Sequence, residues 1–376
     1  MTNSKKLSAG EWLRAFFIAR KVAILPRKRK GEFAIHSLDK LSVLLEDTPE
    51  ARSAGFVSLF LEGNVGHYVL KPGFELANEV KGQPTIRRAV SQIIREASAI
   101  GSSLPRGWIS GWLADKPSDL GLDAREILIT GDELILPAWH QPGGSHWVIH
   151  VHGRTANRAE CLRTFDMFSE LGFSNLAISL RNNSEGSDFA NRRSHFGALE
   201  WRDLEAGVAQ ALKLGAQTIT IFGISQGAVS VAEFLRRSAL GRHVNSVILD
   251  SPVVSWPEVI EYQLELAGEA RRLTQSILRI FSSTVFSRLI GLVKPVELRA
   301  LGFANWSTKF ELPILVLHSR DDGYLPIEPI EKLALRHKTH MTLKTFEAAG
   351  HVRIFNSEPV IYANVIQHFI ETSIKG

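Results

Sequence analysis

The chain of 376 residues contains 44% hydrophobic, 22% charged and 9% aromatic residues, which is typical of a folded globular protein. This composition excludes a collagen, a largely disordered chain and a multi-span membrane protein. The formal charge of +5 is unevenly distributed, because residues 1–30 hold nine basic residues and one acidic residue, Glu11, while the remainder is slightly acidic. We therefore expect no nucleic-acid partner. The single cysteine, Cys161, excludes an intrachain disulfide and a CxxC-type metal site.

Residues 1–30 are predicted to form a basic, amphipathic N-terminal arm. Residues 10–25 can form a helix, which Pro26 and the basic run after it would end. Peripheral contact of residues 1–30 with an anionic membrane and packing of this helix on its own domain are equally good interpretations, and an organelle-targeting segment is a weaker third. Arg20 and Lys21 interrupt the apolar stretch, so no secretory signal peptide is indicated. We expect a cytoplasmic protein, in which the arm would provide any peripheral membrane contact.

Residues 31–106 are predicted to form a small β-rich module. Short segments of alternating polarity are separated by turn signals at Asp-Thr-Pro-Glu and Glu-Gly-Asn. These segments span residues 41–45, 56–61 and 67–70. A helix over residues 87–99 is predicted to follow them. No residue of this module suggests chemistry.

Residues 107–376 are predicted to form an α/β domain. A hairpin around Gly131-Asp132 opens it, and apolar strands then alternate with amphipathic helices. The predicted strands are Trp147–Val151, Leu176–Leu180, Ile219–Phe222, Val247–Leu249, Ile314–Leu317 and Leu343–Phe346. The predicted helices span residues 156–171, 199–213, 227–239, 327–337 and 358–372. This alternation predicts a mostly parallel sheet with helices on both faces, interrupted by a helical insertion at residues 253–312.

The motif Gly223-Ile224-Ser225-Gln226-Gly227 carries the strongest chemical signal in the chain. A bare GxSxG sequence is weak, but this one follows the β-branched strand 218–222 and precedes the helix predicted from Ala228. A strand, a tight turn and a helix are what a nucleophilic serine needs to stand clear of a sheet. Ser225 is therefore the predicted nucleophile.

A serine hydroxyl is a poor nucleophile without a base and a group that orients the base. Of the thirteen histidines, His351 follows the last predicted strand on a glycine-containing loop, which is the position expected for the base. The acid should follow the preceding strand, where Asp321 and Asp322 lie. We favour Asp322 for its spacing to Leu325-Pro326, and Asp250 is a further alternative.

An oxyanion intermediate needs hydrogen-bond donors. The backbone amide of Gln226, after the nucleophile, is one candidate, and the amide of Arg154, on the loop after the strand 147–151, is the other. His150 and His152 could suggest a metal pair, but no third ligand lies nearby, so we expect neither a metal nor a cofactor.

The order of these elements resembles the α/β-hydrolase fold over residues 107–376. Several stretches are similar to a bacterial branch of serine hydrolases related to the serine aminopeptidase and monoacylglycerol lipase-like group, whose members also tend to carry an N-terminal β module. These stretches are His152-Gly153-Arg154 with Asn157-Arg158, Ser179-Leu180-Arg181-Asn182, His195-Phe196-Gly197 with Glu200-Trp201-Arg202-Asp203, and Gly350-His351-Val352-Arg353. Ser319 and Gln226 depart from the usual residues, glycine and methionine, without touching the predicted triad.

The motif and the resemblance together imply a serine hydrolase that cleaves a small-molecule carboxylic ester, with an acyl or lipid-like group as one alternative substrate. The insertion at 253–312 would cover Ser225, and its apolar positions fit either an acyl-binding wall or simple packing. A peptidase or amidase would need a carboxylate in the insertion, such as Glu261, Glu265 or Glu269. An acyltransferase and a non-catalytic ligand-binding protein also remain open, as does the oligomeric state. Arg181 is expected to pair with Asp203 or Glu200.

Overall fold

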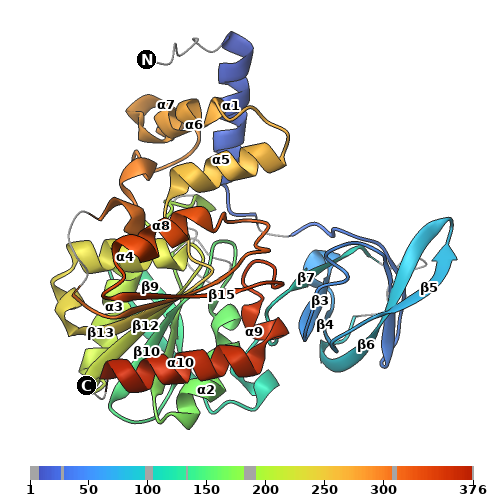
Figure 1. The fold of residues 1–376 in the computed structure, drawn as a ribbon, viewed down its shortest axis with the longest axis horizontal. Coiled ribbons are helices and arrows are strands. Elements are labelled where there is room, and N and C mark those ends of the chain that lie inside the picture. Colours follow the sequence, from blue (N-terminus) through green and yellow to red (C-terminus); the bar gives the residue numbers. More distant parts are fainter. Residues whose placement is uncertain are drawn as a thin grey trace.

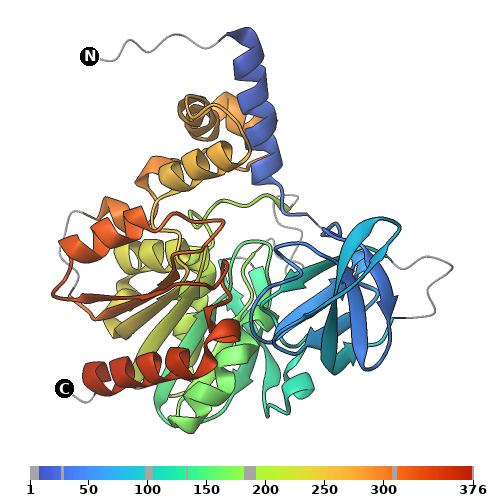
Figure 2. The ribbon, with the colours of Figure 1, turned by 45° about the vertical axis from the view of Figure 1, so that its right-hand side comes forward.

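The computed structural model describes residues 8–26, 29–97, 105–132, 134–181, 192–306 and 311–374. Its ribbon shows three parts: a strand-rich N-terminal module, a larger layered domain, and a group of helices standing above the domain (Figures 1 and 2). Arg27, Lys28, Asn182 and Glu133, which belong to the motifs above, lie outside the described residues. Within the described ranges, no helix has both the length and the apolar character needed to cross a bilayer.

The N-terminal module is a seven-stranded sheet in which every paired neighbour is antiparallel. Its strands are β1 Ile35–Leu38, β2 Ser42–Glu46, β3 Val57–Leu61, β4 His67–Leu70, β5 Glu75–Val80, β6 Gln83–Arg95 and β7 Gly107–Ser110. The long strand β6 pairs with β2, β4 and β5, so it joins both halves of the sheet. One hydrophobic core, which includes Phe33, Leu59 and Ile86, fills the module.

The helix predicted over residues 87–99 is wrong, because Gln83–Arg95 forms strand β6. From Ile86 to Val90 buried and exposed residues alternate, with Ile86, Arg88 and Val90 buried, which is the period of a strand. Arg88 explains why the pattern was misleading. Its charged side chain points inward and donates hydrogen bonds to the carbonyl oxygens of Ala51, Ser53, Gly55 and Lys71. Burial lowers the pKa of Arg88 to about 10.

The larger domain is built on an eight-stranded sheet with the order β15-β14-β13-β12-β10-β11-β9-β8. The strands are β8 Arg125–Gly131, β9 Leu134–Gln141, β10 His146–Val151, β11 Ser174–Ile178, β12 Thr218–Ile224, β13 Val244–Asp250, β14 Ile314–Ser319 and β15 Met341–Phe346. Neighbours from β15 to β11 are parallel, whereas β9 pairs antiparallel with both β11 and β8. The sheet is therefore mixed, and the predicted parallel arrangement holds for its six-strand part only.

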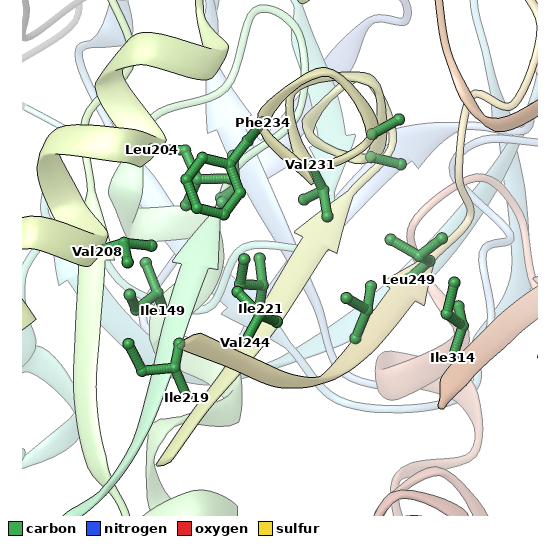
Figure 3. Packing of buried hydrophobic residues seen from close by; sticks show 14 of the residues in the cluster. Ile149, Leu204, Val208, Ile219, Ile221, Val231, Phe234, Val244, Leu249 and Ile314 are labelled. Carbon is green, nitrogen blue, oxygen red and sulfur yellow. The ribbon is translucent and has the colours of Figure 1, made fainter. Parts of the chain in front are cut away.

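Helices cover both faces of this sheet, as Figure 1 shows. They are α2 Phe165–Glu170, α3 Trp201–Lys213, α4 Gly227–Arg237, α8 Glu328–Arg336, α9 Ile354–Ser357 and α10 Pro359–Ile374. Alternate residues of each central strand enter two different cores; on β14, for example, Val316 enters one and Leu317 the other. Figure 3 shows the first core, where Leu204 and Val208 of α3 and Phe234 of α4 lie over Ile149 and Ile221. Four of the five predicted helices are confirmed; residues 156–171 contain a 3₁₀ segment, Arg158–Thr164, before α2.

The helical insertion predicted between two strands is confirmed in the described ranges. Three helices lie between β13 and β14: α5 Trp256–Leu266, α6 Leu273–Ser282 and α7 Thr284–Leu289. They stand beside α1 Ala9–Ala23, away from the sheet (Figures 1 and 2). Ala15, Ala19 and Ala23 of α1 are fully buried in one cluster with apolar residues of the insertion. Small residues spaced four apart let α1 approach the helices of the insertion closely. The N-terminal helix is therefore packed on its own chain.

Candidate active site

Ser225 lies in a tight turn between the end of β12 and the start of α4. Its φ of 51° falls in the left-handed region, which a residue with a Cβ adopts at a cost of order 1–3 kcal/mol. Gly227 permits this turn, because a Cβ there would lie 2.5 Å from the carbonyl oxygen of Val151. Ser225 is buried, with 8% of the residue exposed.

Ser225, His351 and Asp322 form a continuous chain of hydrogen bonds. The Ser225 Oγ lies 3.0 Å from the His351 Nε2, and the His351 Nδ1 lies 2.7 Å from the Asp322 Oδ2. The other carboxylate oxygen of Asp322 accepts from the amides of Tyr324 and Leu325 at 2.8 and 2.9 Å. These contacts bring together the three residues that the sequence singled out.

The charge state of Asp322 follows from its surroundings. Burial alone would raise the pKa of Asp322, but the facing His351 and the hydrogen bond to it outweigh burial and bring the pKa below the ordinary value of 3.8. Asp322 is thus ionised at neutral pH. An ionised carboxylate beside Nδ1 keeps the imidazole proton on Nδ1. The unprotonated Nε2 can then accept the proton of the Ser225 hydroxyl group.

The two other candidate acids have different roles. Asp321 is exposed to solvent. Asp250 is fully buried and accepts from Arg163, Tyr362 and Ser251 at 3.3, 2.9 and 3.0 Å. The Ser251 Oγ in turn accepts from the amide of Val352, the residue after His351. The Asp250 network therefore holds the histidine loop through Ser251. Sequence reasoning missed this role.

Both predicted oxyanion donors belong to residues close to Ser225. The Gln226 amide opens α4, and Arg154 follows Gly153, where a Cβ would lie 3.2 Å from the Ser225 Cβ. Among the contacts of the described residues, neither amide has an acceptor in the protein. Two unsatisfied N–H groups beside a nucleophile are suited to hold a developing negative charge.

Glu160 fixes this loop and was not predicted. Its carboxylate accepts from the Gly153 amide at 2.7 Å and from the Trp112 indole at 3.3 Å. Burial raises the pKa of Glu160, an effect that the nearby Arg163 opposes. The amide of Gly153 is therefore occupied, whereas the next amide, that of Arg154, has no acceptor among the described residues. Glu160 follows Arg154 by six residues in a 3₁₀ segment, so no local sequence pattern announces the contact.

The pair Arg181 and Asp203 is confirmed. The Arg181 guanidinium donates to the Asp203 carboxylate at 2.8 and 3.0 Å, and the Arg181 amide donates to the same carboxylate. Glu200 instead accepts from the amides of His195 and Gly197. These contacts fix the loops that lead into α3, and they leave the Arg181 charge balanced.

The three glutamates of the insertion are also in ion pairs. Glu269 pairs with Arg14 at 2.6 Å, and Glu261 lies 3.5 Å from Arg271, which contacts Glu265 as well. Each carboxylate therefore has a basic partner within the chain.

A second Ser–His–Asp chain lies in the β module. The His67 Nε2 is 2.7 Å from the Ser58 Oγ, and the His67 Nδ1 is 2.9 Å from Asp115. Ser58 and His67 are fully buried, and Ser58 lies in the middle of strand β3. Without access for a substrate, these bonds can only hold the strands together.

His150 and His152 serve the fold rather than a metal. The His150 Nε2 lies 2.9 Å from Asn175, and the His152 Nδ1 donates to the Gly153 carbonyl at 2.8 Å. In the described ranges, no group of three or more histidine, cysteine, aspartate or glutamate side chains is arranged to hold a metal.

These two histidines should make the fold sensitive to acid. Burial lowers the pKa of His150 and of His152 to about 4, whereas an unfolded histidine takes up its proton near pH 6.5. Between these values the unfolded chain binds more protons, so the free energy of unfolding falls as pH drops from 6.5 to 4. We expect each histidine to account for about 3 kcal/mol of this loss. Urea midpoints measured across this range should show it.

A His150→Gln variant should have a smaller dependence of its urea midpoint on pH. His146→Gln, at an exposed position of the same strand, is the matched control and should keep the full dependence. Equal pH dependence in all three proteins would contradict the role of His150.

The β module meets the domain beside the histidine loop. Arg353, two residues after His351, donates to the Ser53 Oγ and to Glu50, both at 2.6 Å. Asn356 donates to the Phe56 carbonyl oxygen at 2.6 Å and to that of Gly111 at 3.0 Å. The module therefore braces the segment that carries the candidate base.

Comparison of the sequence with known proteins gives a distant relative but no family. A scan against protein families finds no match. The uncharacterized protein YqkD of Bacillus subtilis is 26% identical over 231 residues, which cover 60% of this chain and 70% of that protein.

Among solved structures, the esterase Pf2001 of Pyrococcus furiosus is similar with a TM-score of 0.54 and 19% identity, over 69% of this chain and 94% of that one. Est1E of Butyrivibrio proteoclasticus, solved with ferulic acid, has a TM-score of 0.51 and 18% identity, over 66% of this chain and all of that one. At these identities the similarity shows that the chain shares the fold of these two proteins.

Proposed function

We propose that this protein is a serine hydrolase that cleaves carboxylic esters through an acyl-enzyme on Ser225. The hydrogen-bonded chain from the strained Ser225 through His351 to Asp322 is the observation that carries the proposal. The esterase fold supports it. The stretches around Gly153, Arg181 and His351 further support a place near the serine aminopeptidase and monoacylglycerol lipase-like branch.

The proposed reaction has two steps. His351 Nε2 takes the Ser225 proton as Oγ attacks the acyl carbon, and the same proton passes to the departing alcohol oxygen. Asp322 stabilises the imidazolium that forms between these events, and the amides of Gln226 and Arg154 bind the oxyanion. Water then attacks the acyl carbon of the acyl-enzyme and gives a proton to His351 Nε2. The bond between the acyl carbon and Ser225 Oγ breaks, His351 returns the proton to Oγ, and the acid is released. The mechanism draws on side chains, backbone amides and water.

Ester cleavage is favoured over aminopeptidase action. A substrate ammonium group would need a carboxylate, and the candidates Glu261, Glu265 and Glu269 are engaged with arginines. Reaction with a fluorophosphonate probe, followed by peptide mapping, tests the proposal. Phosphonylation of Ser225 is expected. An unlabelled chain would instead favour a ligand-binding protein on a hydrolase scaffold.

We also propose that α1 makes peripheral contact with anionic membranes. Leu13 and Phe17, one helical turn apart, are 53% and 57% exposed, and Arg20 and Lys21 are exposed farther along the helix. An apolar pair beside basic side chains suits an interface that carries negative headgroups. The cytoplasm is the location that we propose for this contact.

Sedimentation with vesicles tests the membrane proposal. Replacing Leu13 and Phe17 together by serine should lower binding to phosphatidylglycerol-containing vesicles by about a hundredfold or more, because about 1.5–3 kcal/mol is lost for each large apolar side chain that no longer enters the bilayer. Leu76→Ser, at an exposed apolar position of the β module, should bind as the wild type does. Equal sedimentation of the double variant would remove α1 as the contact.

A further inference from the structure

The N-terminal segment Ser8–Pro26 is fixed in place by more than apolar packing. Ser8 and Glu11 form a capping box at the start of α1, Glu11 pairs with Arg272, and Arg14 pairs with Glu269 at 2.6 Å. Beyond α1, the Leu25 amide donates to the Arg192 carbonyl at 3.0 Å. The segment therefore has one defined path across the insertion and down to the domain.

This path ends at the candidate oxyanion loop. The Arg154 guanidinium donates to the carbonyl oxygens of Val22 and Ile24, the latter at 3.1 Å. Ser194, whose amide donates to the Ala23 carbonyl at 2.9 Å, also donates through its Oγ to the Gln226 side chain at 3.3 Å. Of the two residues proposed to hold the oxyanion, Arg154 thus binds the N-terminal segment directly, and Gln226 is linked to it through Ser194.

A pocket lies between the segment and the oxyanion loop. Its lining includes Leu25 and Pro26 of the segment together with Gly153, Arg154 and Gln226. Further polar side chains, among them those of Arg181, Arg192 and Glu200, also line it. Its described lining includes no residue of the His351 loop. Ser225 itself is not in this lining, but its chain neighbour Gln226 is, and so is Gly153, where a Cβ would lie 3.2 Å from the Ser225 Cβ. The pocket is therefore next to the nucleophile.

The reaction geometry decides which part of an ester this pocket can take. After attack by Ser225 Oγ, the acyl carbon carries the oxyanion, the leaving oxygen and the acyl chain. The leaving oxygen must lie near His351 Nε2, which protonates it, and the oxyanion must lie at the amides of Gln226 and Arg154. The acyl chain takes the direction that remains, away from His351.

We infer that Leu25 and Pro26 form the outer wall of the acyl pocket and limit the size of the acyl group that the enzyme accepts. This inference rests on the proposed function. Arg154 links the wall to the chemistry, because its amide faces the oxyanion while its guanidinium holds the carbonyl oxygens just before Leu25. The N-terminal segment is therefore part of the substrate site.

A series of p-nitrophenyl esters from acetate to octanoate tests the inference. Leu25→Trp should narrow the pocket and lower the ratio of kcat/KM for octanoate to that for acetate by about tenfold or more. Leu25→Gly should raise the same ratio. Ala9→Trp is the matched control: it adds the same ring to an exposed position of the same segment and should leave the ratio unchanged.

A second series, in which the acyl group is acetyl and the alcohol varies, locates the wall. Leu25→Trp should leave the alcohol preference as it is in the wild type. A changed alcohol preference with a constant acyl preference would overturn the inference, as would unchanged preferences in both Leu25 variants while fluorophosphonate still labels Ser225. Failure of the proposed function is a different result, since the wild type itself would then remain unlabelled.

Discussion

Replacement of Ser225 by alanine should lower kcat for ester hydrolysis by about a million-fold, the loss expected when the nucleophile of a triad is removed. Fluorophosphonate labelling should disappear as well. The His351 Nε2 faces the Ser225 hydroxyl group, so the variant has no nucleophile at that position for His351 to activate. The fold should survive, since alanine keeps the Cβ and removes only the hydroxyl group. Single-turnover assays with p-nitrophenyl acetate, combined with intact-protein mass measurement, would follow both effects.

Ser58→Ala is the matched control for this experiment. Ser58 belongs to an equally complete Ser–His–Asp chain, but it is fully buried in strand β3. Its loss leaves the His67 Nε2 without a partner and should cost about 1–3 kcal/mol of stability, with kcat and labelling unchanged. If Ser225→Ala kept its turnover, or if Ser58→Ala lost it, the assignment of the nucleophile would be wrong.

Asp322→Asn should lower kcat by about 10⁴-fold with little change in KM. The asparagine amide oxygen can still accept from the amides of Tyr324 and Leu325, so the loop should keep its shape. The side chain loses the charge that stabilises the imidazolium, and His351 is then free to adopt the tautomer that faces Ser225 with an N–H group. Steady-state kinetics with a soluble ester would measure the loss.

Asp321→Asn removes the same charge from the neighbouring, exposed position and should leave kcat within a few-fold of the wild type. The two variants differ in whether the carboxylate that is removed faces His351. A large loss in Asp321→Asn, or a small one in Asp322→Asn, would reverse our choice between the two acids.

Local patterns predicted the elements of the larger domain well. The turn at Ser225 requires glycines at fixed positions between a strand and a helix, and all of these residues are consecutive in the sequence. The loops that carry Asp322 and His351 follow strands whose apolar runs are equally local. The strand order then brings the three side chains together, because the carboxyl ends of parallel strands meet at one edge.

The missing parts of the prediction depend on contacts between distant residues. Glu160, the Asp250 network and the wall at Leu25 have no local signature, since each is defined by partners elsewhere in the chain. Strand β6 was predicted as a helix because the inward-facing Arg88 breaks the expected alternation of apolar and polar residues. Hydrogen bonds to the surrounding carbonyl oxygens offset the free-energy cost of burying its charge. The basic charge of residues 1–30 likewise concealed the alanine face that packs α1 on the insertion.

The order of Ser225, Asp322 and His351 along the chain has a consequence for synthesis. The nucleophile precedes the base by 126 residues, and the acid precedes the base by 29. Since a chain leaves the ribosome from its N-terminus, the serine turn emerges well before the loop that carries His351. A half-made chain thus displays a hydroxyl group with no base to take its proton, which is a poor nucleophile. Under the proposed function, the nascent chain should therefore have no esterase activity until the loop that carries His351 has been synthesised.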